Sequence, residues 1–166
     1  MSSLAYIGIG SNLGDRQANC LGAIADLDRC SGVTVTGRSR LYLTEPVGYT
    51  EQDWFANAAV RVQTELAPVA LLGLIKGLEQ SAGREQGGPR FGPRVLDLDI
   101  LFYDQMVATA PDLAIPHPRL HQRRFVLAPL CDIDPDFIHP VFGLSLARLL
   151  EGLDSKGQKV IDTCAC

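Results

Sequence analysis

The sequence contains no apolar run of about 18 residues, the length that a helix needs to cross a bilayer. Its first ten residues lack a basic start and hold only a short apolar stretch, so we expect no secretory signal, no membrane contact and a cytoplasmic location. Hydrophobic residues make up 46% and charged residues 20% of the 166 positions. This balance argues against a disordered chain and predicts one domain spanning residues 1–166.

Cysteine and histidine are too few and too scattered for a zinc centre. The five cysteines are odd in number, the three histidines do not cluster, and neither His-Glu-x-x-His nor paired Cys-x-x-Cys occurs. Cys164 and Cys166 are spaced to hold a soft metal, although two free thiols at a frayed end are the favoured interpretation. No Gly-x-Ser-x-Gly elbow is present. Gly8-x-Gly10-x-x-x-Gly14 lacks the Lys-Ser/Thr of a P-loop and indicates a close-packed strand end and turn.

Positive charge is also scarce, since the formal net charge is −4. An acidic protein is a poor partner for nucleic acid, which binds basic surfaces. Arg84, Arg90 and Arg94 nevertheless gather in one stretch, and a second basic cluster lies between His117 and Arg124. Such clusters suit a small phosphate-bearing ligand. Two solvated loops explain them equally well on composition alone.

Hydrophobic periodicity predicts strands over residues 4–9, 33–43, 55–64 and 95–103. Helices are predicted from Asp15 to about Arg29, from Pro68 to Gly83, over 123–132 and over 145–153. Residues 84–93 carry five glycines and prolines and predict a long loop, and residues 111–121 are expected to be irregular. The order predicts an α+β protein with a ferredoxin-like βαββαβ core and a C-terminal helical extension. Its antiparallel sheet would carry two helices on one face and leave the other open for a ligand.

Two acids stand in the last of these strands. Asp97 and Asp99 alternate with Leu96, Leu98 and Ile100, so we expect the acids on the open face and the apolar residues on the packed face. Two carboxylates about 6–7 Å apart repel unless a cation lies beside them, and hard oxygen ligands suit Mg²⁺. Asp-x-Asp alone is a weak signal, for which two solvated acids are the simpler explanation.

The neighbouring arginines favour a metal site over two solvated acids. Arg90 and Arg94 come just before the acids, with Gly92-Pro93 as a turn between them. Cations and metal together would clamp a triphosphate, as phosphoryl transfer requires.

Elsewhere, Phe55, Asn57 and Phe125 could bind a flat polar heterocycle. The two aromatic rings would stack on its faces, and the asparagine would supply a hydrogen-bond donor and an acceptor. Core aromatics with a satisfied amide are the better explanation of these three from spacing alone.

Ordered motifs run through nearly the whole chain. They are Ala5 to Gly14, Tyr42-x-Thr44-x-Pro46-x-Gly48, Phe55-x-Asn57-Ala-Ala-Val60, Glu79 with Gly83-Arg84, Arg90-Phe-Gly-Pro-Arg-Val-Leu-Asp-Leu-Asp-Ile100, Pro116-His117-Pro118, and Arg123 to Leu130. In this order they resemble the 6-hydroxymethyl-7,8-dihydropterin pyrophosphokinase family of folate biosynthesis. The resemblance implies diphosphate transfer from ATP to the pterin hydroxymethyl group, which gives AMP and the pterin diphosphate.

The resemblance also implies a role for individual residues. Arg90, Arg94, Asp97 and Asp99 would be catalytic, and the two aspartates would hold two Mg²⁺ ions. ATP would be bound by Glu79, Arg84, Arg90, Arg94, Ile100, His117 and Arg123. The pterin would be bound by Thr44, Pro46, Val47, Phe55, Asn57, Phe91 and Phe125. We expect the enzyme to act as a monomer.

Five positions depart from the family pattern. Phe91 replaces a tryptophan, Gln86 a basic residue and Lys76 an amide, while Asp112 and Pro118 replace a basic and an aromatic residue. The resemblance also implies that the loop over residues 84–93 closes over the bound substrates, and these changes bear on that closure and on ATP affinity.

Two other functions compete with this one. The first is an Asp-x-Asp nucleotidyltransferase that attacks the α-phosphorus and releases pyrophosphate, and the second is a ferredoxin-like module that senses a small ligand without catalysis.

Overall fold

A computed structural model describes residues 2–46, 51–83, 95–154 and 158–162. Most predicted elements are present, with boundaries shifted by no more than two residues. The elements are β1 (Ser3–Ser11), α1 (Arg16–Arg29), β2 (Val33–Arg38), β3 (Tyr42–Thr44), β4 (Phe55–Thr64), α2 (Pro68–Ser81), β5 (Asp97–Tyr103), β6 (Ala108–Ala110), β7 (Leu113–Ile115), the 3-10 helix η1 (Leu120–Gln122), α3 (Arg124–Ile133), α4 (Leu146–Glu151) and β8 (Val160–Asp162).

Local signals begin and end the first two helices as the sequence predicts. The Asp15 carboxylate accepts a hydrogen bond from the Ala18 amide at 3.1 Å and so caps α1. Pro68 occupies the first turn of α2, where its missing N–H costs nothing. Gly83 follows α2 with φ of 93°, a left-handed conformation that glycine adopts easily.

The single strand predicted over residues 33–43 is wrong, because the structure divides it into β2 and β3. Both pair with β4, and the break lies at Ser39. The Ser39 amide donates to the Ala59 carbonyl at 2.9 Å, and the Ala59 amide donates to Ser39 Oγ at 2.8 Å. The serine hydroxyl thus takes the place of a backbone acceptor, which ends regular pairing at this point.

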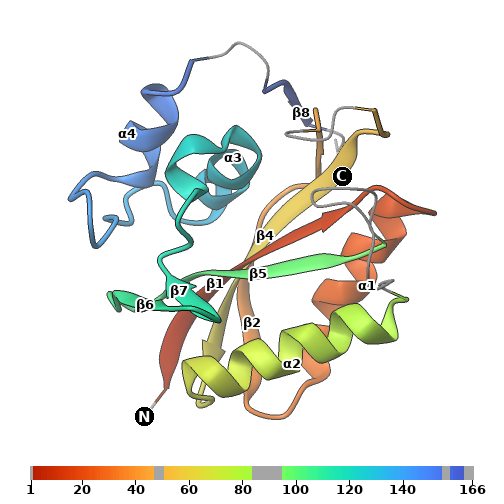
Figure 1. Ribbon diagram of the computed structural model, residues 1–166, viewed down its shortest axis with the longest axis horizontal. Helices are drawn as coiled ribbons and strands as arrows, with labels where there is room; N and C mark the ends of the chain where they lie inside the picture. Colours follow the sequence, from red (N-terminus) through yellow and green to blue (C-terminus); the bar gives the residue numbers. More distant parts are fainter. Residues whose placement is uncertain (1, 47–50, 84–94, 155–157, 163–166) are drawn as a thin grey trace.

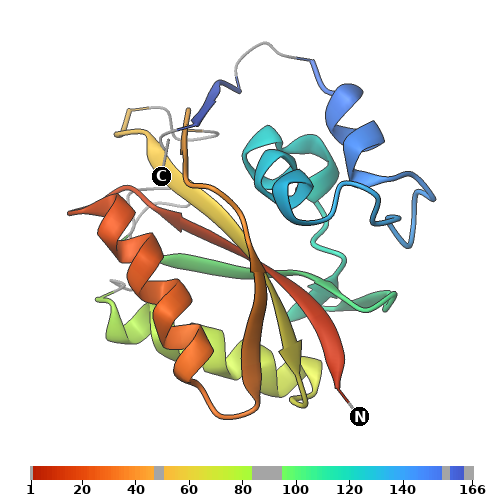
Figure 2. The same ribbon diagram turned by 180° about the vertical axis from the view of Figure 1, so that it is seen from behind.

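The sheet is antiparallel in the order β5-β1-β4-β3-β8, and β2 pairs with the same edge of β4 as β3. Helices α1 and α2 lie together on one side of it (Figure 2). The predicted α+β class and antiparallel sheet are therefore confirmed. None of the helices in the described parts of the chain is long and apolar enough to cross a membrane.

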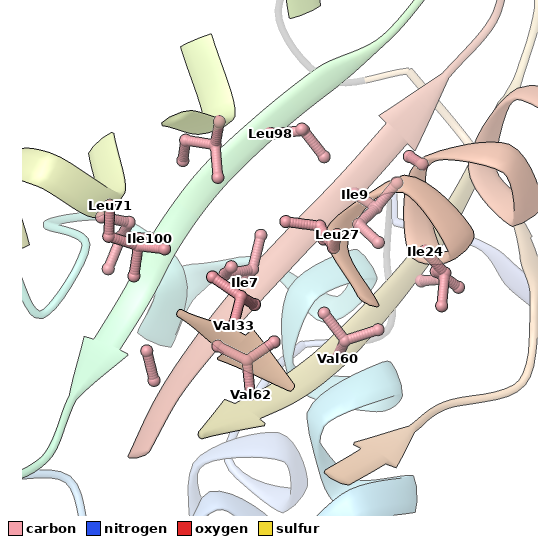
Figure 3. Packing of buried hydrophobic residues seen from close by; sticks show 14 of the residues in the cluster. Ile7, Ile9, Ile24, Leu27, Val33, Val60, Val62, Leu71, Leu98 and Ile100 are labelled. Carbon is pink, nitrogen blue, oxygen red and sulfur yellow. The ribbon is translucent and has the colours of Figure 1, made fainter. Parts of the chain in front are cut away.

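The larger hydrophobic core lies between the sheet and these two helices. Figure 3 shows its strand residues meeting those of α1 and α2. The labelled members are Ile7, Ile9, Ile24, Leu27, Val33, Val60, Val62, Leu71, Leu98 and Ile100. Full burial of each such side chain contributes about 1.5–3 kcal/mol, so this layer accounts for most of the driving force of folding.

A second core covers part of the opposite face, which the sequence predicted to be open. Tyr6 and Phe102 project from β1 and β5 on this side, and Leu127, Leu130 and Leu146 of α3 and α4 pack over them. Figure 1 shows α3 and α4 on the other side of the sheet from α2. The prediction of a wholly open face is wrong because the C-terminal helices bury the apolar residues of one half of it.

Candidate active site

The two predicted acids lie where β5, an edge strand of the sheet, begins. Asp97 and Asp99 are partly exposed on the face that carries the second core. Leu96, Leu98 and Ile100 alternate with them and are buried in the first core. The predicted division of this strand into a packed face and an acidic face is therefore confirmed.

Glycines of β1 lie directly beside the acids. Gly8 is paired with Asp99 and Gly10 with Asp97, so no neighbouring side chain covers either carboxylate from that strand. Gly10 is also paired with Asn57 of β4 on its other side. The space above Gly10 is taken by the Asn57 amide, whose Nδ2 would lie 2.9 Å from an added Cβ, and the space above Gly8 by the Leu101 side chain.

Glu79 of α2 anchors the same stretch of β5 from the sheet edge. It is 1% exposed, and its Oε1 accepts the Leu98 amide at 2.7 Å. Lys76 donates to Glu79 Oε1 at 3.1 Å and to the Leu98 carbonyl at 3.2 Å. An edge strand has polar groups that no neighbouring strand satisfies, and these two side chains satisfy both groups of Leu98. The residue that they fix lies between Asp97 and Asp99.

A β-bulge places His117 near the acids. The register between β1 and β5 shifts so that Leu101 has no partner in β1, and its carbonyl instead accepts the His117 amide at 3.0 Å. His117 Nδ1 accepts the Arg119 amide at 3.2 Å, which leaves Nε2 as the protonated nitrogen. Burial, with help from the Arg123 charge, lowers the pKa of His117 to about 4. At neutral pH it is an uncharged hydrogen-bond donor.

Arg123 and Phe125 stand where α3 begins. Burial lowers the pKa of Arg123, while the negative charges of Asp99 and Asp97 act in the opposite direction. The guanidinium also lies 5.4 Å from the centre of the Phe125 ring, within the range of a cation–π contact. The structure thus brings Arg123 and His117 to the side of the sheet where the aspartates are.

Four of the predicted pterin residues, Thr44, Pro46, Phe55 and Asn57, lie on or directly beside β3 and β4. Thr44 is paired with Phe55, and Asn57 lies two residues beyond Phe55 on the same face. Thr44 Oγ1 donates to Asn57 Oδ1, and Asn57 Nδ2 donates to the Ile9 carbonyl at 3.3 Å. Thr44 is 1% and Asn57 9% exposed, so this amide is held in a single orientation. Pro46 is buried just beyond Thr44.

Sequence reasoning missed the anchors of the loop before β4. Asn12 Nδ2 donates to Gln52 Oε1 at 2.8 Å and to the Asp53 carbonyl at 3.1 Å, and Arg16 donates to the Trp54 carbonyl at 2.5 Å. These bonds join residues about 40 positions apart, so no local sequence pattern predicts them.

The remaining predicted residues divide into two groups. The Ile100 side chain lies in the first core, away from the acids. Val47, Arg84, Arg90, Phe91 and Arg94, with the departure Gln86, lie outside the described residues. Of the other departures, Asp112 and Pro118 are exposed, and Lys76 pairs with Glu79.

The donor set of the site fits a magnesium ion better than a metal held by protein ligands alone. Within the described ranges there is no group of three or more His, Cys, Asp or Glu side chains that would hold a metal. Mg²⁺ typically uses one or two carboxylates and completes its shell with water and substrate phosphates. Asp97 and Asp99, which are partly exposed and face only glycines in β1, match that requirement.

Comparison with known proteins identifies the family. The family model described as 7,8-dihydro-6-hydroxymethylpterin-pyrophosphokinase (HPPK) matches residues 6–135. A 2-amino-4-hydroxy-6-hydroxymethyldihydropteridine pyrophosphokinase of Methylorubrum extorquens is 42% identical over 92% of this chain and 95% of its own length. The Bacillus subtilis protein of the same name is 45% identical over 80% of this chain and 79% of its own.

Solved structures share the fold at low identity. A Plasmodium falciparum HPPK-DHPS structure matches with a TM-score of 0.72 and 17% identity, and it covers 91% of this chain but 44% of that longer one. A wild-type structure of the same protein with pterin and p-hydroxybenzoate gives a TM-score of 0.70 at 18% identity. The family match extends over most of the chain and over almost the full length of a close relative, and on these grounds the chain belongs to the HPPK family.

Proposed function

We propose that this protein transfers diphosphate from ATP to the hydroxymethyl group of 6-hydroxymethyl-7,8-dihydropterin, giving AMP and the pterin diphosphate for folate biosynthesis. One observation carries the proposal beyond family membership. Gly10 is paired with Asp97 on one side and with Asn57 on the other. Adjacent strands are about 4.8 Å apart, so the main chains that carry Asp97 and Asn57 are separated by about 10 Å, with a glycine between them. That span suits a pterin ring with its hydroxymethyl group directed at a bound triphosphate.

The pterin side is the wall formed by β3 and β4. Asn57 keeps one lone pair and one N–H beyond its bonds to Thr44 and Ile9, which suits the donor and acceptor edge of a pterin. Phe55 and Phe125 would stack on the ring, and Pro46, Val47 and Phe91 would complete the wall.

The ATP side is formed by β5, α2 and the start of α3. Asp97 and Asp99 would hold Mg²⁺, for which we propose two ions, and the bound metal would neutralise charge on the phosphates. Arg123 and neutral His117 would donate to phosphate oxygens. The other proposed ATP residues are Glu79, Arg84, Arg90, Arg94 and Ile100, of which Arg90 and Arg94 would also stabilise the transition state.

In the reaction, the hydroxymethyl oxygen forms a bond to the β-phosphorus of ATP. The bond from that phosphorus to the oxygen shared with the α-phosphorus breaks, and AMP leaves with that oxygen. The proton of the hydroxyl group passes to solvent or to a phosphate oxygen. The chain's own contribution is to align the two substrates and to exclude water, which are the main tasks in phosphoryl transfer.

The test is incubation with ATP, Mg²⁺ and the reduced pterin, followed by ³¹P NMR. AMP and a pterin diphosphate are expected. Release of pyrophosphate would favour the nucleotidyltransferase, and calorimetry that shows ATP binding without Mg²⁺ and no turnover would favour the non-catalytic module. The ferredoxin-like topology, the C-terminal helical extension, the single domain over 1–166, the monomer and the cytoplasmic location stay predictions.

A further inference from the structure

The segment 158–162 lies beyond residue 135, where the family match ends. It nevertheless makes hydrogen bonds next to proposed site residues on both the pterin side and the ATP side. Its strand β8 pairs with β3, with Val160 opposite Thr44. The Glu45 amide donates to the Lys159 carbonyl at 2.9 Å, and the Lys159 amide donates to the Glu45 carboxylate at 3.1 Å. These bonds hold the chain on either side of Glu45, next to Thr44 and Pro46 on the pterin side. Figure 1 shows β8 near the beginning of β4, on the side towards α3.

Gln158, one residue earlier, holds the start of α3. Its Oε1 accepts the Arg124 amide at 2.8 Å, and its Nε2 donates to the Gln122 carbonyl at 3.0 Å. Both bonds go to main-chain groups, one on each side of Arg123. Arg123 is the N-cap residue of α3, and a guanidinium has no acceptor with which to cap a helix. Gln158 therefore supplies, from a distant part of the chain, an acceptor for the first amide of α3, one of the helix-start amides that have no partner within the helix.

We propose that Gln158 is a positioning residue for Arg123 in the diphosphate-transfer reaction, and this inference rests on the proposed function. Two hydrogen bonds fix the main chain before and after Arg123, so they limit where its guanidinium lies relative to Asp99 and Asp97. The next residue, Lys159, fixes Glu45 on the pterin side. Gln158 and Lys159 are adjacent in the chain, so the peptide bond between them links the ATP side to the pterin side and limits the distance between the two sides.

Positioning of this kind matters because the reacting groups must be aligned closely. Displacement by about 1 Å at a catalytic centre lowers rates by up to about a hundredfold. Loss of one or two hydrogen bonds of ordinary net strength corresponds to about a fivefold to thirtyfold loss in kcat/KM. We expect Gln158→Ala to fall in that range for ATP. Gln158→Glu keeps the acceptor for the Arg124 amide but loses the donor to Gln122, so its loss should be smaller.

The experiment combines kinetics with amide exchange of Arg124 measured by NMR. In Gln158→Ala we expect the Arg124 amide to exchange at least about ten times faster, because its acceptor is gone. In an Arg123→Ala background, Gln158→Ala should lower kcat/KM for ATP by less than about twofold, because the two residues act together. Gln63→Ala is the matched control, since Gln63 also makes an amide hydrogen bond to a distant segment, at Ser2. It should leave the kinetics unchanged.

Each outcome decides between positioning and simple stabilisation. A loss of kcat/KM in Gln158→Ala that is equally large in the Arg123→Ala background would overturn the proposal, even if the variant melts at a lower temperature. Unchanged Arg124 exchange would overturn it without reference to any reaction. If the wild-type protein forms no AMP, the proposed function and its kinetic consequence both fail, while the exchange data still decide whether Gln158 holds α3.

Discussion

Gly10→Ala should damage the pterin side of the site while it leaves the acidic side intact. A Cβ at this position would lie 2.9 Å from Asn57 Nδ2 and 3.7 Å from Phe55 Cδ1. Contacts below 3.0 Å are essentially never seen for a real Cβ, so the Asn57 amide must move. The three nearest atoms all belong to Asn57 and Phe55, and none belongs to Asp97.

The cost follows from what that amide holds. If Asn57 moves, the nearly fully buried Thr44 hydroxyl loses its acceptor and the Ile9 carbonyl loses a donor. An unsatisfied buried polar group costs about 1–3 kcal/mol, so we expect a fall of this size in the free energy of unfolding. Because the same displacement misaligns the amide, pterin affinity should fall about tenfold to a hundredfold. ATP affinity should change by less than about threefold.

Urea unfolding and calorimetry with each substrate measure these quantities. The matched control is Gly22→Ala, because an added Cβ at this exposed position in α1 would meet nothing within 4 Å. That change should leave both affinities unchanged and raise stability by up to about 1 kcal/mol through helix propensity. Gly10→Ala with wild-type stability and wild-type pterin affinity would refute the reasoning.

Three further predictions concern charge. Asp97→Ala or Asp99→Ala should lower AMP formation at least about a hundredfold, and near-normal turnover in both would contradict the metal assignment. Glu79→Leu leaves the Leu98 amide without its acceptor and should cost about 1–3 kcal/mol in urea unfolding, whereas Glu79→Gln, which keeps an acceptor, should cost less. Burial lowers the pKa of His139 below its usual 6.5, so the unfolded chain takes up a proton first and stability should fall as pH drops below about 6.5. His139→Asn should weaken the dependence of the free energy of unfolding on pH, measured by urea titration at several pH values. The same pH dependence in the variant and the wild type would contradict the role given to His139.

Much of the fold follows from local patterns. The alternation of Asp97 and Asp99 with leucines was enough to divide β5 into an acidic and a packed face. Asp15 before α1 and Pro68 in the first turn of α2 likewise predicted where the first two helices begin. The prediction failed at Ser39, where a side chain replaces a ladder bond, and at the face that α3 and α4 cover. In both places the outcome depends on a partner strand or helix that periodicity does not identify.

The site divides in the same way. The residue types are read directly from the sequence, and the face on which each strand side chain lies follows from the geometry of one strand. Tertiary packing alone brings Glu79 to Leu98, the Asn57 amide over Gly10, His117 to the bulge at Leu101, and Gln158 to the main chain on either side of Arg123. The residues in these pairs are 16 or more positions apart. Strand order and register bring them together, and these depend on how the whole chain packs.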